Sequence, residues 1–215
     1  MSIENNGAHK VIVYIDGFNC YFGLKESQWQ CYYWLDYAKL AHKLASKIMA
    51  ENPTLVATKY FTARISAPED KRRRQTTFLE ALEAHSDTKF YYGHYRENKY
   101  SCSGCGRPNF VPNEKQTDVN IAVNMVVDAV QDNFDTAILI GGDSDLIPPV
   151  ETIKRLYPHK RVIACFPPNR HSKHLRKVCN GQIHLSESDF KNNQLPETVR
   201  RKDGYTLERP QRWNK

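Results

Sequence analysis

The sequence predicts an α/β protein with a central, mainly parallel sheet, as in Rossmann-like folds. Apolar residues alternate along the chain between short runs with strand character and longer stretches with helical spacing. The 215 residues suffice for a single domain that buries its own core. No internal repeat or low-complexity block divides the chain.

Short apolar runs rich in β-branched or aromatic residues predict five strands, at 11–15, 55–63, 89–95, 136–140 and 161–166. Helical spacing predicts helices at 36–50, from Pro68 onward, at 118–131, at 148–156 and at 171–179. Strands separated by helices in this way are typical of parallel sheets.

Composition divides the chain into three parts. We expect an N-terminal leader at 1–9, one domain at 10–190 and a basic, loosely packed tail at 191–215, where apolar residues are few. Within the domain, glycines and prolines at 96–116 predict an irregular loop.

The charge balance favours a polyanionic partner without proving one. Lysine and arginine number 31 against 24 acidic residues, so the formal net charge is +7. No apolar run reaches the roughly 18–20 residues that a transmembrane helix needs. The N-terminus lacks the layout of a secretory signal, so we expect a cytoplasmic protein with no membrane partner.

Two acidic motifs directly follow predicted strands. Asp16-Gly-Phe-Asn19 comes after the strand at 11–15, and Gly141-Gly-Asp-Ser-Asp145 comes after the strand at 136–140. Ligands of open α/β sheets bind at the carboxyl ends of the strands, so these side chains converge if the two strands are neighbours. Crowded carboxylates repel one another unless a cation neutralises them, and hard divalent cations prefer oxygen ligands.

Each motif has a simpler interpretation, because Asp-Gly and Gly-Asp pairs also form turns after strands. The two motifs together favour a metal site. Asp118 begins the helix that leads into the strand at 136–140. Its side chain can join the same edge or cap its own helix, and the sequence does not choose.

Three segments in this order resemble the NYN domain, the LabA-like branch of the PIN-like nucleases. They are Ile15-Asp-Gly-Phe-Asn19, Glu114-Lys-Gln-Thr-Asp-Val119 and Gly142-Asp-Ser-Asp-Leu-Ile-Pro148. The stretch from His171 to Leu175 extends the resemblance, which covers about residues 10–190.

The resemblance implies a PIN-like, three-layer α/β/α sandwich and an endoribonuclease that uses Mg²⁺ or Mn²⁺. We predict single-stranded RNA as its substrate, although the sequence leaves the strand preference open. The metal ligands it implies, which are also catalytic, are Asp16, Asp118, Asp143 and Asp145, with Asn19 as their polar catalytic partner. Ser144 would orient a ligand or water. The metal ion would activate a water for in-line attack on phosphorus and stabilise the leaving oxygen.

One position departs from the family pattern. Asn124 stands six residues after Asp118, where many relatives place another aspartate. An amide supplies no charge, although it can still contact a metal-bound water or the substrate. The resemblance therefore implies a weaker second metal site.

Several basic residues are candidates for binding phosphates. Lys115 precedes the helix of Asp118. The sequence supports two interpretations of this lysine equally, a contact with the substrate phosphate and a solvated side chain. Arg72 and Arg73 lie near the start of a predicted helix, where positive charge opposes the helix dipole. They are candidates for phosphate contact, with a solvated helix face as the alternative. Arg64 follows a predicted strand and could line a substrate groove.

Two further groups have weaker signals. Cys102 and Cys105 have the spacing of half a structural zinc site, but no second such pair exists, which favours a free pair. His171, His174 and His184 show no nucleophile–base pattern, and we interpret them as structural or phosphate-facing.

Competing functions are less well supported. Phe18 stands where a haloacid-dehalogenase-like phosphatase needs its second acid, and the glycine-rich turn of dinucleotide-binding enzymes is absent. The serious alternative is a non-catalytic nucleic-acid-binding or regulatory protein with the NYN fold. The sequence does not decide between RNA and DNA. The sequence also leaves the oligomeric state open. A homodimer would join the basic surfaces of two copies into a longer one.

Overall fold

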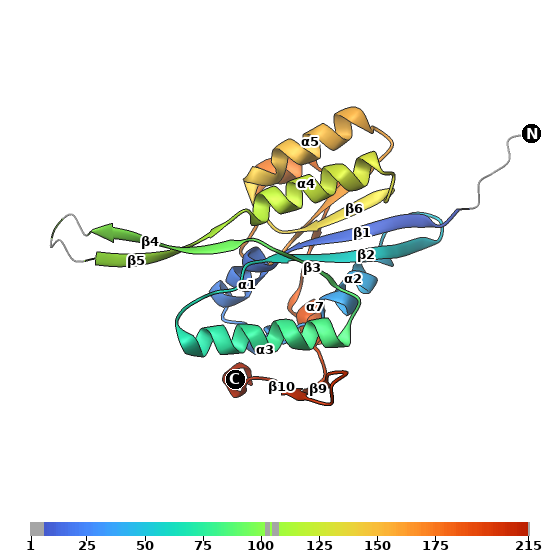
Figure 1. The fold of residues 1–215 in the computed structure, drawn as a ribbon. Helices are drawn as coiled ribbons and strands as arrows, with labels where there is room; N and C mark the ends of the chain where they lie inside the picture. Colours follow the sequence, from blue (N-terminus) through green and yellow to red (C-terminus); the bar gives the residue numbers. More distant parts are fainter. Residues whose placement is uncertain (1–6, 102–103, 105–107, 215) are drawn as a thin grey trace, which may run out of the picture.

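The structure, a computed structural model, describes residues 7–101, 104 and 108–214. Its main sheet has six strands in the order β3-β2-β1-β6-β7-β8, all parallel (Figure 1). The strands are β1 (His9–Asp16), β2 (Pro53–Thr62), β3 (Lys89–Tyr92), β6 (Thr136–Ile140), β7 (Arg161–Phe166) and β8 (Gly181–His184). This order makes β1 and β6 direct neighbours.

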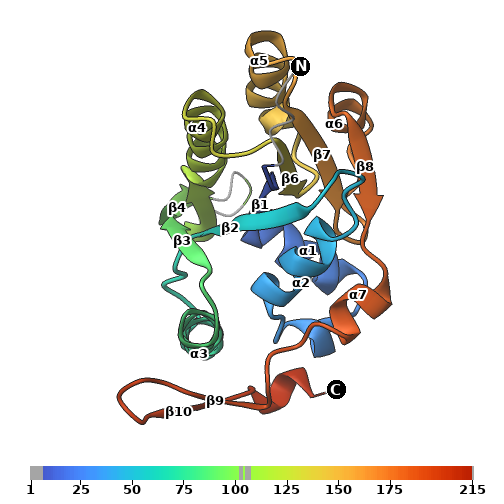
Figure 2. The same cartoon turned by 90° about the vertical axis from the view of Figure 1, so that its right-hand side faces the viewer.

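Helices cover both faces of the sheet and make a three-layer α/β/α sandwich (Figure 2). One face is covered by α4 (Thr117–Val130), α5 (Ile147–Leu156) and α6 (Lys173–Val178). The other is covered by α1 (Gly17–Glu26), α2 (Tyr37–Ala45), α3 (Glu69–His85) and α7 (Glu187–Lys191). The predicted PIN-like α/β class is confirmed. None of the helices in the described residues combines the length and apolar character that crossing a bilayer requires.

The sheet has a hydrophobic core on each face, and this explains why the sequence of β1 is an unbroken apolar run. Val11, Val13 and Ile15 point into the core beneath α1 and α2, whereas Ile12 and Tyr14 point into the core beneath α4 and α5. All five side chains are at most 2% exposed. A strand buried on both faces needs apolar residues at every position.

The predicted elements were found with shifts of at most three residues at their ends, except the helix predicted at 36–50, which ends at Ala45. The strands at 136–140 and 161–166 were predicted with their observed bounds. Helix α1 was not predicted, because its buried face consists of Gly17, Cys20, Gly23 and Leu24 and shows no strong apolar stripe. Strand β8 and helix α7 are short and were also missed.

The prediction of an irregular loop at 96–116 was wrong. This stretch forms most of an antiparallel ribbon, β4 (His94–Ser101) paired with β5 (Pro108–Lys115), which projects from the body of the molecule (Figure 1). A two-stranded ribbon has two free edges, so it tolerates prolines that a central strand excludes. Cys102 and Cys105 lie outside the described residues, so the zinc prediction stays untested.

The tail was also predicted wrongly, because residues 191–215 were expected to be loosely packed. Within the described part, β9 (Thr198–Arg200) and β10 (Thr206–Glu208) form a hairpin beside α3, followed by the short 3-10 helix η3 (Gln211–Trp213). Val199, Leu207 and Trp213 are buried in the core that α1, α2 and α3 share. A few large apolar side chains anchor this polar segment.

Candidate functional site

The predicted convergence of two acidic motifs depends on β1 and β6 being neighbours, and they are. The strands pair in parallel with Ile15 opposite Ile140. Asp16 is the last residue of β1, and the loop from Gly141 to Asp145 follows β6 directly. Both motifs therefore leave the sheet at its carboxyl edge, side by side.

A hydrogen bond joins the two motifs. The side-chain oxygen Oδ1 of Asn19 accepts from the backbone amide of Gly142 at 3.0 Å. Asp16 caps α1, because its Oδ1 accepts from the amide of Asn19 at 2.9 Å. Asn19 thus positions the loop after β6, and its amide oxygen is already engaged by the protein backbone.

Gly142 allows a close approach that any larger residue would prevent. A Cβ atom added at Gly142 would lie 1.8 Å from the carbonyl oxygen of Arg170. The loop after β6 is therefore packed against the segment that follows β7. A side chain here would push Asp143 away from its neighbours.

Asp118 reaches this edge from the start of α4. The helix begins after Gln116, a non-glycine residue with a φ of 78°, and no side chain caps it. Strained backbone of this kind is found at functional sites more often than elsewhere. The sequence left two roles open for Asp118, and its side chain does not cap α4.

The carboxylates act on one another electrostatically. Asp16 is only 4% exposed, and this burial raises the pKa of its carboxyl group to about 7. The hydrogen bond from the amide of Asn19 lowers this pKa, whereas the negative charges of Asp118 and Asp143 raise it further. Burial also raises the pKa of Asp118, with contributions from Asp143 and Asp145. Over the described residues, none of the four pairs with a lysine, arginine or histidine.

The donor chemistry suits a hard divalent cation, since four carboxylates offer only oxygen ligands and lack a positive partner. Their arrangement is not that of a coordination sphere. In the part of the chain that the structure describes, no three His, Cys, Asp or Glu side chains are placed to hold a metal ion. The carboxylates are gathered at one edge without forming an assembled metal centre.

Asn124 forms side-chain hydrogen bonds within the protein. Its Oδ1 accepts a hydrogen bond from Nζ of Lys59 at 3.1 Å, and its Nδ2 donates to the carbonyl of Asn120. Lys59 is buried and forms an ion pair with Asp128 at 2.6 Å. Both functional groups of Asn124 are therefore used within the protein, between α4 and β2 and along α4, and the weaker second metal site stays a prediction.

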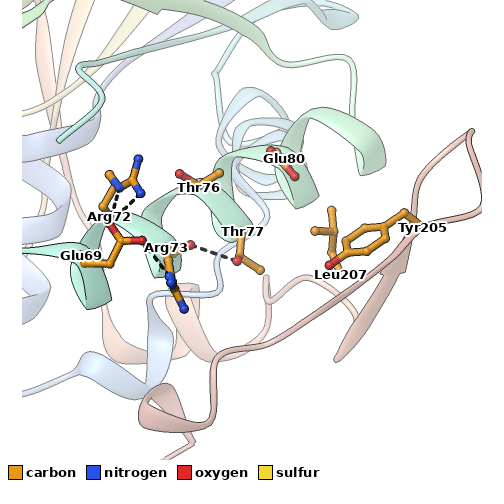
Figure 3. Close-up of a pocket in the computed structure, with 8 residues that line it drawn as sticks. All are labelled: Glu69, Arg72, Arg73, Thr76, Thr77, Glu80, Tyr205 and Leu207. Carbon is orange, nitrogen blue, oxygen red and sulfur yellow. Dashed lines mark hydrogen bonds and ion pairs between the residues drawn. The ribbon is translucent and has the colours of Figure 1, made fainter. Parts of the chain in front are cut away.

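Arg72 and Arg73, two of the arginines predicted to bind phosphates, line a hollow on α3. Arg72 and Arg73 both pair with Glu69 on the surface of α3. They line a hollow of about 430 Å³ that Tyr205 and Leu207 of the C-terminal hairpin close on one side (Figure 3). None of the four site carboxylates lines this hollow.

Three other predicted residues are exposed near the ends of strands. The guanidinium of Arg64, just after β2, lies 4.9 Å over the ring of Tyr92 at the end of β3. Lys115 ends β5, three residues before Asp118, and forms no ion pair within the described residues. Ser144 begins η2 (Ser144–Leu146), whose first turn Asp143 caps by accepting from the amide of Asp145 at 2.9 Å.

Comparison with known proteins gives the family of this chain. The family model of the NYN domain matches residues 10–187. A 6-hydroxy-3-succinoylpyridine 3-monooxygenase from Pseudomonas putida is 27% identical over 172 residues, which are 66% of this chain and 54% of that protein. The chain therefore spans about half the length of this curated relative.

The fold has a counterpart among solved structures. The crystal structure of a protein of unknown function from Vibrio parahaemolyticus superposes with a TM-score of 0.55 at 20% identity, over 88% of this chain and 99% of that one. This likeness shows the fold alone. The match over residues 10–187 shows more: the chain belongs to the NYN domain family, a branch of the PIN-like nuclease superfamily.

Proposed function

We propose that this protein is a metal-dependent endoribonuclease that hydrolyses phosphodiester bonds of single-stranded RNA with Mg²⁺ or Mn²⁺. The observation that supports it most is the carboxylate group at the carboxyl edge between β1 and β6. Asp16 is buried there beside Asp118 and Asp143, and its pKa is raised to about 7. Burying such a group is costly unless a cation or a proton neutralises it.

Each residue of the group has a distinct part in the proposal. Asp16 and Asp143 would hold the ion from the two adjacent strands, with Asp118 and Asp145 beside them. When bound, a divalent cation supplies an activated water and charge stabilisation of the leaving oxygen. Asn19 holds the loop after β6 through the amide of Gly142, and this bond keeps Asp143 close to Asp16.

The substrate part of the proposal is supported by charge. The chain has a formal net charge of +7 although its candidate site is acidic. Lys115 and Ser144 are exposed close to the site in sequence and fold, so they are available to phosphate oxygens. RNA is the proposed polymer, and DNA is compared with it in the same experiment.

The test is cleavage of labelled single-stranded RNA and matched DNA by purified protein in Mg²⁺, Mn²⁺ or EDTA. Asp16→Asn and Asp143→Asn remove one charge each at nearly constant shape. We expect metal-dependent cutting that both variants lose by a factor of about a hundred or more.

A matched control separates this result from a general effect of charge. Asp87 is exposed, makes no side-chain bond within the described residues, and precedes β3 at the opposite edge of the sheet. Asp87→Asn should cut like the unchanged protein. Equal activity of all three variants would show that the cutting comes from a contaminant, and the proposal would fail.

A second candidate is a non-catalytic protein of the same fold that binds nucleic acid. The observation in its favour is that no metal-binding arrangement is assembled in the described residues. Binding of RNA without cleavage in any metal would select it.

The Pseudomonas relative does not lead us to propose an oxygenase. Small aromatic substrates bind in enclosed, mostly apolar pockets. Two hollows of the described residues, about 430 and 510 Å³, are open and lined mostly by charged and polar side chains.

The proposal includes a cytoplasmic location and a homodimer. Cys20 and Cys165 are buried free thiols, which suits a reducing compartment such as the cytoplasm. The homodimer stays a prediction, and light scattering from the purified protein measures it directly.

A further inference from the structure

We propose that His171 and His184 form a stacking subsite for a nucleobase of the RNA strand, next to the carboxylates. The inference rests on the proposed function and adds a substrate-positioning surface to the same site. It comes from two exposed imidazoles that lie near the loop after β6: His184 at the end of β8 and His171 in the segment that follows β7.

The two rings are built onto the sheet. Phe166 ends β7 and His184 ends β8, and the two residues are partners in the parallel ladder. The ring of His171 lies 4.6 Å from that of Phe166 and is nearly parallel to that of His184, with centroids 5.5 Å apart and planes 13° apart. Phe166 is only 1% exposed, so it is a fixed support for the two imidazoles.

This cluster is next to the candidate active site. Arg170, whose carbonyl oxygen contacts Gly142, directly precedes His171. Strands β6, β7 and β8 are consecutive in the sheet, so their carboxyl ends follow one another along one edge (Figure 2). Adjacent strands are about 4.8 Å apart, so the backbone of His184 at the end of β8 is about 10 Å from the end of β6.

The imidazoles pack on Phe166, but their polar nitrogens are not used within the protein. Both side chains are exposed, and within the described residues neither imidazole forms a hydrogen bond or an ion pair. A core histidine is usually buried with its nitrogens hydrogen-bonded. Exposed, parallel aromatic rings are instead the usual platform for an unpaired base of single-stranded RNA.

The charge around the cluster favours the same ligand. Helix α6 begins two residues after His171, and its Lys173, Arg176 and Lys177 are exposed without an ion pair in the described part of the chain. These free positive charges attract the phosphates on either side of a stacked base. A single strand would thus place its backbone at the carboxylates and one base on the imidazoles.

The test measures binding separately from cleavage. Anisotropy of an end-labelled single-stranded RNA is titrated in EDTA with the unchanged protein, with His171→Ala/His184→Ala and with His171→Phe/His184→Phe. Loss of one stacked base should raise the Kd of the alanine pair about tenfold, whereas the phenylalanine pair should stay within about twofold. In the cleavage assay the alanine pair should raise KM and leave kcat unchanged.

The matched control is His159→Ala. His159 is also exposed and also packs on an aromatic ring, that of Tyr157, but it lies before β7 at the other edge of the sheet. Its substitution should leave the Kd unchanged. Far-ultraviolet circular dichroism and thermal melting check that all variants fold.

The outcomes separate this subsite from the proposed function. An unchanged Kd of the alanine pair overturns the subsite. A phenylalanine pair that binds RNA as weakly as the alanine pair also overturns it, because the imidazoles would then act through charge or hydrogen bonds and not through stacking. If the alanine pair binds weakly but no variant or metal gives cleavage, the subsite stands and the nuclease proposal fails. A protein that binds no RNA at all removes both.

Discussion

The amide oxygen of Asn19 lies 3.0 Å from the backbone nitrogen of Gly142, and this hydrogen bond joins two motifs that are 123 residues apart in the chain. Asn19 stands on the first turn of α1, and Gly142 stands in the loop after β6. The bond holds Asp16 and Asp143 on the same side of the sheet.

Asn19→Ala should loosen the loop after β6. Removing the acceptor leaves the Gly142 amide without its protein partner, so the free energy of unfolding should fall by about 1–2 kcal/mol. Cleavage should fall further than this loss explains, because Asp143 is no longer held beside Asp16. Urea denaturation and initial cleavage rates measure the two effects. A variant with full activity would show that the bond is not needed for the site.

Asp16→Asn should stabilise the metal-free protein above neutral pH. The folded pKa of Asp16, about 7, exceeds its ordinary value of 3.8, so the folded state binds the extra proton between these values. Stability therefore falls as pH rises from about 4 to about 7, by roughly 4 kcal/mol for this group. Asparagine is neutral throughout and does not have this loss.

The measurement is urea unfolding in EDTA at a series of pH values, with the difference between Asp16→Asn and the unchanged protein as the readout. The difference should be small near pH 4 and should grow in favour of the variant up to about pH 7. Asp87→Asn, at an exposed residue, should show no such trend. A pH-independent difference would mean that Asp16 stays ionised in the folded protein.

Asn124→Asp should not create a metal ligand. The new carboxylate would lie beside Nζ of Lys59, which already contacts Oδ1 of Asn124 at 3.1 Å. It should add to the buried charge network and leave the Mn²⁺ concentration for half-maximal activity unchanged. A Mn²⁺ titration of the cleavage rate checks this, and a clear fall in that concentration would restore the family-based interpretation of this position.

Lys59→Met should cost about 3–5 kcal/mol of unfolding free energy, because it leaves Asp128 buried without its partner. Asp128 also accepts a hydrogen bond of 2.6 Å from the hydroxyl of Tyr14. The double variant Lys59→Met/Asp128→Leu should recover part of the loss, since no buried charge is then unpaired.

Its control is Arg73→Met, at an exposed pair with Glu69 on α3. That change should alter stability by less than about 1 kcal/mol. Chemical denaturation of the unchanged protein, Lys59→Met, Asp128→Leu and the double variant gives the coupling energy of the buried pair, and Arg73→Met is measured beside them. Equal costs for the buried and the exposed pair would contradict the prediction.

Trp213→Ala should destabilise the whole domain by about 3 kcal/mol or more. Trp213 is 8% exposed, and its ring contacts those of Trp34 and Phe78. Tyr205→Ala, at a tyrosine that is 62% exposed on the same C-terminal segment, should cost little. Thermal melting of both variants compares them, and a harmless Trp213→Ala would mean that the segment does pack loosely.

Local pattern predicted the elements that build the site. The β-branched runs before Asp16 and Gly141 are buried on both faces, so their apolar character alone marked them as strands. The placement of Asp16 and Asp143 at the strand ends followed from the same runs. The sequence was less informative where packing is done by small residues, as on α1, or by single large ones, as with Trp213 in the tail.

By itself the sequence determined the α/β class, the strands β1 and β6 and the carboxylates at their ends, because strand periodicity and turn chemistry are local properties. Only the tertiary structure decided that β1 and β6 are neighbours and that Asn124 bonds to Lys59. It also decided that Asp16 is buried deeply enough to raise its pKa to about 7, and that His171 stacks beside His184. These facts depend on contacts between residues far apart in the chain, which no local pattern records.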